Sequence, residues 1–172
     1  SEGFVYQVRP NTNYGSRFVS TGSQAYGDTD TTIAGEFAFI HGPFSVQAEY
    51  AEISVDGINE DGGLTPLANR RSDADFQTGY IFASWFPTGE MRRYEANRGE
   101  FNRTRILNPV NAGGTGAFEL AVRYDNVDLS GIQTVRRFTG PGGPVDVLGP
   151  VDRGGEYQAV TLGANWYPFP YV

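Results

Sequence analysis

The stretch Gly116-Ala-Phe-Glu-Leu-Ala-Val-Arg-Tyr124 decides the fold. Within the longer segment Gly116–Leu129, the even positions from Phe118 to Tyr124 are apolar, while the odd positions between them are polar or small. A period of two places successive side chains on opposite faces of an extended chain. The pattern therefore predicts a β-strand over Gly116–Leu129 that presents one apolar face and one polar face.

Similar alternation predicts further strands along the chain. One segment, Phe76–Phe86, is apolar on both faces, which predicts a strand but leaves its register unassigned. Six strands in a chain rich in glycine and aromatic residues favour an all-β, antiparallel architecture. The four other predicted strands are Gly3–Arg9, Thr32–His41, Phe44–Val55 and Glu156–Tyr167.

The composition excludes several classes of protein. The 172 residues include no cysteine, which removes disulfide scaffolds, thiolate metal sites and cysteine nucleophiles. All 13 basic residues are arginines, against 20 acidic residues, and a net charge of −7 without a basic block argues against a nucleic-acid partner. The longest strongly apolar stretch, around Tyr80–Phe86, is far shorter than the ~20 residues of a transmembrane helix, whereas a barrel strand needs only ~9–11.

The connections between the predicted strands alternate in length. Gly42–Pro43 is a tight turn, while Asp56–Asp75, Pro87–Thr115 and Ser130–Gly155 are long and rich in turn-forming residues. Short turns on one side and long loops on the other are typical of outer-membrane barrels. A soluble sandwich stays the alternative, because its strands also carry one apolar face.

Aromatic residues near the strand ends favour the barrel over the sandwich. Membrane barrels carry girdles of aromatic side chains at both interfaces, and the opposite faces of these strands mix Glu, Gln, Arg and Gly, which suits a wet lumen. The residues assigned to the girdles are Phe44, Tyr50, Phe118, Tyr124, Trp166 and Tyr167.

Several segments, read in order, carry a family resemblance. They are Arg17-Phe-Val-Ser-Thr-Gly22, Gly42-Pro-Phe-Ser-Val-Gln-Ala-Glu-Tyr50, Trp85-Phe-Pro-Thr-Gly-Glu-Met-Arg-Arg-Tyr94, Gly116–Tyr124 with Asp128-Leu129, and Gly154-Gly155 followed by Thr161-Leu-Gly-Ala-Asn-Trp-Tyr167. The set resembles the C-terminal half of the phosphate-selective porin O and P family. That resemblance implies a sixteen-stranded, homotrimeric barrel in the outer membrane of a Gram-negative bacterium, in contact with lipid and lipopolysaccharide, through which anions such as phosphate diffuse.

The strand count points to an incomplete barrel. The smallest bacterial barrels have ~8 strands, and the family resemblance implies roughly ten strands beyond the six predicted here. We therefore expect residues 1–172 to be a partial barrel domain, an internal fragment of a longer porin. If the polypeptide is this short, its open strand edges must pair with other copies, which describes a β-rich assembly without a channel.

The candidate site lies in Pro87–Gly116, where five arginines and three glutamates give a local charge of +2. By resemblance, this connection folds into the lumen, and its basic side chains meet the anion at the constriction. A guanidinium offers five donors in a fixed fork that fits phosphate or carboxylate. The alternative is a salt-bridged turn that braces the barrel wall. The candidate arginines here are Arg92, Arg93, Arg98, Arg103 and Arg105.

A sixth candidate, Arg123, lies on the predicted lumen face of its strand. The alternative for Arg123 is a cross-strand pair with a carboxylate such as Glu49 or Glu119, and Arg9 and Arg17 are weaker candidates. In the family the phosphate site depends on lysines, of which this chain has none. We therefore expect permeation by phosphate-like or other small anions, or by small solutes in general, and the absence of lysine leaves the preferred anion open.

No catalytic arrangement is found in the sequence. There is no defensible Ser/His/Asp set, metal-ligand spacing or nucleotide-binding fingerprint, so we expect a protein that is not an enzyme and holds no cofactor. Carboxylates in loops can bind Ca²⁺, but none of these pairs has calcium-loop spacing, and solvated loops are the favoured interpretation. The acidic groups concerned are Asp28 and Asp30; Asp56, Glu60 and Asp61; and Asp73 and Asp75.

Overall fold

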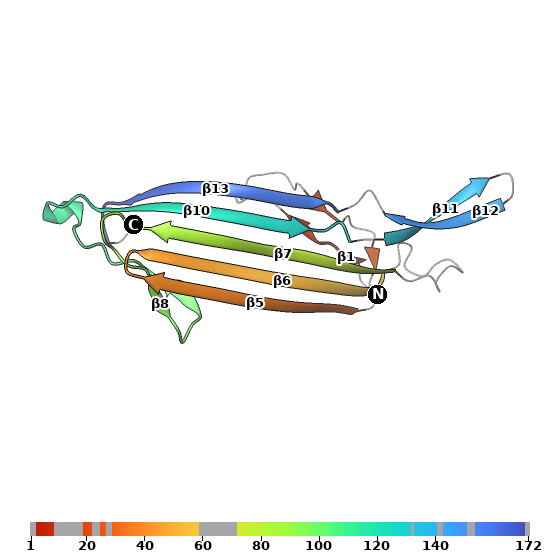
Figure 1. Ribbon diagram of the computed structural model, residues 1–172, viewed down its shortest axis with the longest axis horizontal. Coiled ribbons are helices and arrows are strands. Elements are labelled where there is room, and N and C mark those ends of the chain that lie inside the picture. The colour runs from red at the N-terminus through yellow and green to blue at the C-terminus, as the bar shows by residue number, and fades with distance from the viewer. Residues whose placement is uncertain are drawn as a thin grey trace. The chain divides into compact units, whose positions relative to one another are not determined.

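A computed structural model describes residues 3–8, 19–21, 25–26, 29–58, 72–131, 133–140, 143–150 and 154–170. Five long strands form one sheet in the order β13-β10-β7-β6-β5, and neighbouring strands run in opposite directions (Figure 1). The all-β, antiparallel prediction is confirmed. Within the described residues the sheet is open, with β5 and β13 at its edges. The strands are β5 (Thr29–His41), β6 (Phe44–Ile58), β7 (Ser72–Trp85), β10 (Ala117–Asp128) and β13 (Glu156–Tyr167).

The sixth predicted strand, Gly3–Arg9, is replaced by two short strands, β1 (Gly3–Phe4) and β2 (Gln7–Val8). β1 pairs with β4 (Ala25–Tyr26), and β2 pairs with β3 (Val19–Ser20). Between them, the Tyr6 amide donates to Thr21 Oγ1 at 3.0 Å, and the Thr21 amide donates to the Tyr6 carbonyl at 2.9 Å. The Thr21 hydroxyl thus accepts the Tyr6 amide in place of a backbone carbonyl of a paired strand, and the strand is interrupted there. Arg9 and Arg17 lie outside the described residues.

Two of the long connections contain hairpins of their own. Ser130–Gly155 includes β11 (Gln133–Gly140) paired with β12 (Gly143–Pro150). Pro87–Thr115 includes β8 (Arg93–Glu95) paired with β9 (Glu100–Asn102), and the short 3-10 helix η1 (Val110–Ala112). Three-residue strands are too short to show alternation, so the sequence pattern did not predict them. Most of the third connection, residues 59–71, lies outside the described residues.

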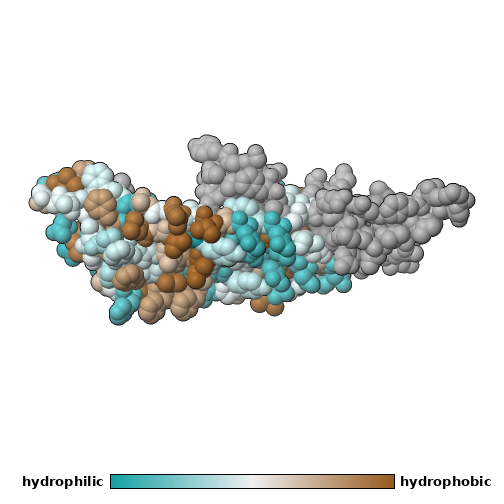
Figure 2. Space-filling model, turned by 45° about the horizontal axis from the view of Figure 1, so that its top comes forward, coloured by the Kyte–Doolittle hydropathy of each residue, from teal (hydrophilic) through white to brown (hydrophobic). Residues whose placement is uncertain are grey.

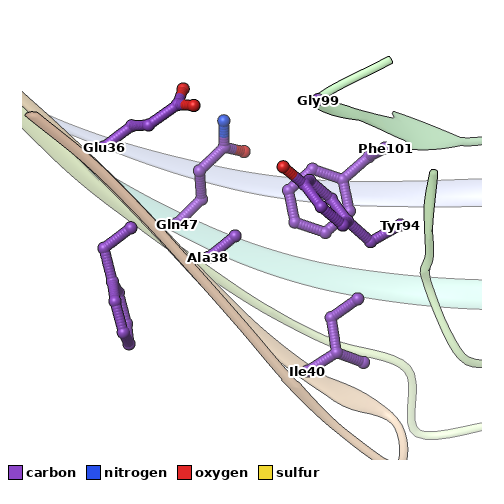
Figure 3. A pocket seen from close by; sticks show the side chains of 8 residues that line it. Glu36, Ala38, Ile40, Gln47, Tyr94, Gly99 and Phe101 are labelled. Atoms are coloured by element: carbon purple, nitrogen blue, oxygen red, sulfur yellow. The ribbon is translucent and has the colours of Figure 1, made fainter. Parts of the chain in front are cut away.

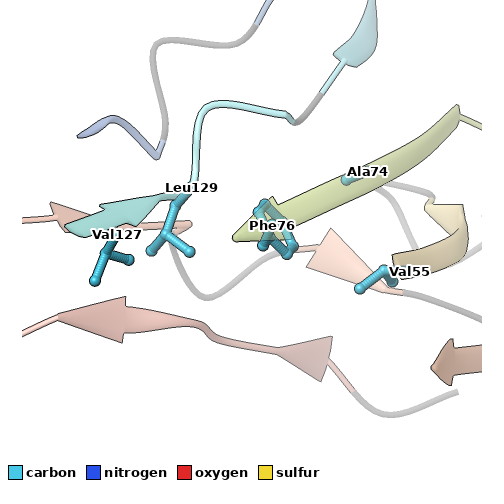
Figure 4. Packing of buried hydrophobic residues seen from close by; sticks show 5 residues of the cluster. All are labelled: Val55, Ala74, Phe76, Val127 and Leu129. Atoms are coloured by element: carbon cyan, nitrogen blue, oxygen red, sulfur yellow. The ribbon is translucent and has the colours of Figure 1, made fainter. Parts of the chain in front are cut away.

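The chain divides into two compact units, each with its own apolar core. The first comprises residues 1–34, 50–79 and 126–158, and the second residues 35–49, 80–125 and 159–172. In the first unit, β6, β7 and β10 contribute a buried cluster against which Tyr6, Ile53 and Tyr157 pack (Figure 4). The buried residues of this cluster are Val55, Ala74, Phe76, Val127 and Leu129.

The second unit has a smaller core at the end of β7 and the start of β10. Phe86, Ile106 and Ala117 are buried there, and Tyr167 packs against them with its ring centroid 6.2 Å from that of Phe86. This core joins the connection between β7 and β10 to the last residue of β13.

Gly116, at the start of β10, provides a sharp test of this packing. Its φ is +77°, and a Cβ there would lie 2.7 Å from the Tyr167 carbonyl oxygen and 2.8 Å from Trp166 Nε1. We expect Gly116→Ala to lower the free energy of unfolding by at least about 2 kcal/mol, because it adds both backbone strain and a clash. Chemical denaturation measures the loss.

The matched control for Gly116→Ala is Gly35→Ala, on β5, where a Cβ would meet nothing within 4 Å. This change should alter the unfolding free energy by no more than about 0.5 kcal/mol. Equal effects of the two substitutions would contradict the close approach of Gly116 to β13.

Candidate functional site

Between Phe118 and Asp125, strand β10 has its large apolar side chains at the surface and its carboxylates buried. Leu120 is 48% exposed and Phe118 45%, whereas the neighbouring Glu119 is 1% exposed and Asp125 7%. In water the opposite arrangement is favoured, because apolar surface is driven into the interior and an unpaired buried charge is costly. The alternation predicted for Gly116–Leu129 is confirmed, and it places the apolar row on the outside.

Strands β6 and β7 show the same inversion, because Ser45 and Ser84 are buried while Phe44 and Trp85 are exposed. The edge strands β5 and β13 also expose apolar side chains. Figure 2 shows hydrophobic side chains, in brown, gathered on the surface. Exposed apolar patches this extensive mark a surface that contacts another apolar medium or partner. The exposed apolar residues of this outer face are Phe37, Phe39, Phe44, Ile81, Trp85, Phe118, Leu120, Val122, Tyr124, Val160, Leu162 and Trp166.

Aromatic pairs gather at the end of the strands that holds the Gly42–Pro43 turn and the β7–β10 connection. Phe44 stacks on Trp85 with ring centroids 5.7 Å apart, and Phe118 stacks on Trp166 at 6.2 Å. The Trp166 indole also donates to the Thr115 carbonyl at 2.9 Å. Such rings, with an apolar body and a polar tip, suit a boundary between apolar and wet surroundings.

The assignment of Tyr167 to the aromatic girdles is wrong. Its hydroxyl donates to Glu119 Oε2 at 2.7 Å, and its ring packs in the second core, so Tyr167 lies on the polar face. The reason is geometric. Adjacent residues in a strand point to opposite faces, so Trp166 and Tyr167 cannot share one.

Glu119 is the centre of the polar face in the second unit. Its carboxylate accepts hydrogen bonds from Arg92 Nη2 at 2.6 Å, Tyr167 Oη at 2.7 Å and Asn165 Nδ2 at 3.1 Å. The donors come from the β7–β10 connection and from β13. A buried carboxylate is stable only when its oxygens are paired in this way, so Glu119 ties these two segments to β10.

Arg92 joins the β8–β9 hairpin to the sheet. Besides Glu119, its Nε donates to Ser84 Oγ at 3.2 Å. Its guanidinium lies 5.2 Å from the Phe82 ring centroid on β7 and 5.6 Å from that of Phe101 on β9. These contacts are those of the bracing interpretation that the sequence left open for Arg92, and its contact with an anion stays a prediction.

The contacts of Ser84 and Phe82 also resolve the register of β7. Ser84 Oγ lies 2.9 Å from Ser45 Oγ, and both serines are buried. Even-numbered residues of β7 therefore share the polar face with Glu119. The sequence pattern did not contain this information, because β7 is apolar on both faces.

Arg123 lies in a second polar network on the same face. Its Nη2 pairs with Asp125 Oδ1 at 2.8 Å, and its guanidinium lies 3.7 Å from the Tyr80 ring centroid. The Tyr80 hydroxyl in turn donates to Glu49 and accepts from Gln47 Nε2 at 2.9 Å. Arg123 thus has a carboxylate partner, as the alternative interpretation expected, but the partner lies on its own strand.

The four other candidate arginines are exposed. Arg98 pairs with Glu95 at 3.7 Å across the β8–β9 turn. For Arg93, Arg103 and Arg105, no ion pair is found among the residues that the structure describes. The connection itself is held by Glu90, which is buried and accepts from the Leu107 amide at 3.2 Å and from the Thr88 hydroxyl. Arg93, Arg103 and Arg105 are therefore exposed without an ion pair among the described residues, while Arg92 and Arg123 are paired with carboxylates.

Sequence reasoning missed the central role of Glu119 and Tyr80. Glu119 carried a signal, because a lone carboxylate between alanines on the inward positions of β10 needs a cationic partner. Tyr80 carried none, since the register of its strand was not assigned.

An antiparallel sheet with an apolar outside and a hydrogen-bonded, charged inside is the arrangement found in the walls of membrane β-barrels. No helix in the described ranges is both long and apolar enough to cross a membrane. The sequence profile of the phosphate-selective porin O and P family matches residues 5–172, and the chain belongs to this family.

A curated relative matches the chain over a limited stretch. An uncharacterized protein of Caulobacter vibrioides is 46% identical over 55 residues. These residues make up 32% of this chain and 11% of the relative. No solved structure matches the chain significantly.

Proposed function

We propose that the chain forms part of the wall of a longer outer-membrane β-barrel, in a Gram-negative bacterium, through which small anions diffuse passively. The observation that carries the proposal is the inverted polarity of the sheet strands in the second unit, with Leu120 exposed beside the buried Glu119. Lipid acyl chains contact the apolar outer face. On the inner face, water and the networks around Glu119 and Arg123 supply hydrogen-bond partners for the polar groups.

The strand lengths and the open edges fit this wall. The five strands contain 12 to 15 residues, and ~9–11 tilted residues suffice to cross the hydrocarbon core. Unpaired strand edges are not tolerated in lipid, so β5 and β13 pair with further strands of the barrel. Family membership supports a homotrimer in contact with lipid and lipopolysaccharide.

Anion contact is assigned to the exposed arginines of the β7–β10 connection. Arg93, Arg98, Arg103 and Arg105 present guanidinium groups to solvent, whereas Arg92 and Arg123 are held by Glu119 and Asp125. Several exposed cations in series attract an anion and also release it, which conduction requires. Because lysine is absent, the channel accepts chloride and small organic anions as readily as phosphate.

The test is the ion selectivity of the full-length protein in planar bilayers. Under a potassium chloride gradient, the reversal potential should indicate preferential passage of chloride. The triple substitution of Arg93, Arg103 and Arg105 by glutamine should move the chloride-to-potassium permeability ratio towards one, because it removes the unpaired positive charge of the connection.

Met91→Gln is the control for this selectivity experiment, since Met91 is exposed on the same connection and carries no charge. It should leave the reversal potential unchanged. Cation selectivity of the unmodified protein would contradict the anion assignment, and a soluble monomer without detergent would contradict the membrane wall itself.

A further inference from the structure

The second unit contains a cavity of about 530 Å³ that is lined by none of the arginines of the two polar networks. It lies between strands β5 and β6 of the sheet and the β8–β9 hairpin (Figure 3). Ligand-binding cavities in proteins commonly have volumes of about 300–1,000 Å³, with apolar walls and a few placed polar groups. The cavity has both the size and the kind of lining that a small ligand needs.

Its hairpin wall is formed by two aromatic rings. Tyr94 on β8 and Phe101 on β9 are directly paired across the hairpin, and their ring centroids lie 5.5 Å apart at an interplanar angle of 72°. Figure 3 shows both rings on the side of the cavity opposite Glu36 and Gln47. Such rings offer apolar faces with negative potential, which attract the weakly positive C–H groups of a ligand.

Its sheet wall offers hydrogen-bonding groups. Glu36 contributes a carboxylate for which no partner is found among the described residues. Gln47 contributes a carboxamide whose nitrogen donates to Tyr80 Oη at 2.9 Å and to Glu49 at 3.4 Å, which fixes the orientation of the amide. Planar groups of this kind can bond two neighbouring hydroxyls of one ligand.

The charges around the cavity discriminate between ligand classes. None of the described lining residues is basic, and the carboxylate of Glu36 repels an anion. An organic cation is disfavoured at the aromatic wall, because the Arg92 guanidinium already lies 5.6 Å from the Phe101 ring centroid. A neutral ligand with hydroxyls and an apolar ring face matches both walls.

We infer that this cavity binds a neutral, polyhydroxylated solute, a monosaccharide or a short saccharide, with its ring against Tyr94 and Phe101 and its hydroxyls on Glu36 and Gln47. None of the exposed arginines is among the described lining residues of this site, which adds a second class of solute to the proposed anion channel. Binding here retains the sugar beside the wall, and does not require that the same groups contact an anion.

The test is glucose binding to the full-length protein in detergent, measured by saturation-transfer NMR. The readout is equilibrium binding, so it does not depend on conductance and separates failure of this inference from failure of the channel proposal. Glucose C–H protons should receive saturation. Tyr94→Ala and Glu36→Gln should each raise the dissociation constant about tenfold, since the first removes an aromatic ring and the second replaces a charged hydrogen-bond acceptor by a weaker neutral one.

Met91→Ala is the matched control for Tyr94→Ala, because Met91 is similarly exposed on the same connection but does not line the cavity. Tyr94→Phe keeps the ring and the hairpin packing, and should weaken binding less than Tyr94→Ala. Binding that is unaffected by Glu36→Gln and Tyr94→Ala would overturn the inference. Displacement of glucose by inorganic phosphate or by choline would overturn it too, because it would mark the cavity as an anion or a cation site.

Discussion

Replacing Glu119 with alanine is expected to destabilise the full-length protein by about 3 kcal/mol. The substitution leaves Arg92 without its carboxylate and removes the common acceptor of Tyr167 and Asn165. Breaking a buried ion pair on one side typically costs about 3–5 kcal/mol, and the partial exposure of Arg92 places this case at the lower end. Chemical denaturation in detergent, followed by the loss of β-sheet circular dichroism, measures the change.

Glu95→Ala is the control for this loss. Glu95 also pairs with an arginine, Arg98, but at 3.7 Å and with both side chains exposed, so its removal should cost no more than about 1 kcal/mol. Glu119→Gln keeps the shape and two acceptor lone pairs, and should fall between the two. If Glu119→Ala and Glu95→Ala unfold at the same denaturant concentration, the network around Glu119 does not hold the hairpin to the sheet.

Leu162→Arg should give a loss of similar size for a different reason. Leu162 is 78% exposed on the outer face of β13. On a protein surrounded by water, an exposed substitution changes stability by no more than about 0.5 kcal/mol. On the lipid face of a barrel, an arginine near the bilayer midplane costs about 2–4 kcal/mol. Equilibrium folding into phosphatidylcholine vesicles over a denaturant series measures the difference.

The control for Leu162→Arg is Met91→Arg, which places the same side chain at an exposed apolar position on the β7–β10 connection. Because this connection lies beyond the strand ends, we expect a change of no more than about 1 kcal/mol. A tolerated Leu162→Arg would mean that the outer face of β13 does not contact lipid.

Alternation predicted the strands well where one face is apolar. β10, β6, β13 and β5 agree with their predicted ranges to within a few residues, and so does β7, whose register was left open. The prediction failed at Gly3–Arg9, because the bond from Tyr6 to the Thr21 side chain interrupts the strand. A contact between residues distant in sequence leaves no trace in the local pattern.

The sequence predicted which arginines belong to the candidate site, but only part of how they are arranged. The sequence located the arginines and offered two roles for each. The structure holds Arg92 and Arg123 against carboxylates, while the anion-contact role stays a prediction for the exposed arginines. The cavity beneath Tyr94 and Phe101 was not predicted, because it depends on how the hairpin lies over β5 and β6. That placement follows from tertiary packing.

The aromatic pairs have a spectroscopic consequence. The two tryptophans of this chain, Trp85 and Trp166, both stand in stacked pairs at the same end of the sheet, on its outer face. Their emission is therefore a local optical probe that senses the polarity of one rim and is insensitive to events at the other. Quenchers carried at known lipid depths can use this signal to locate that rim along the bilayer normal, without an attached label.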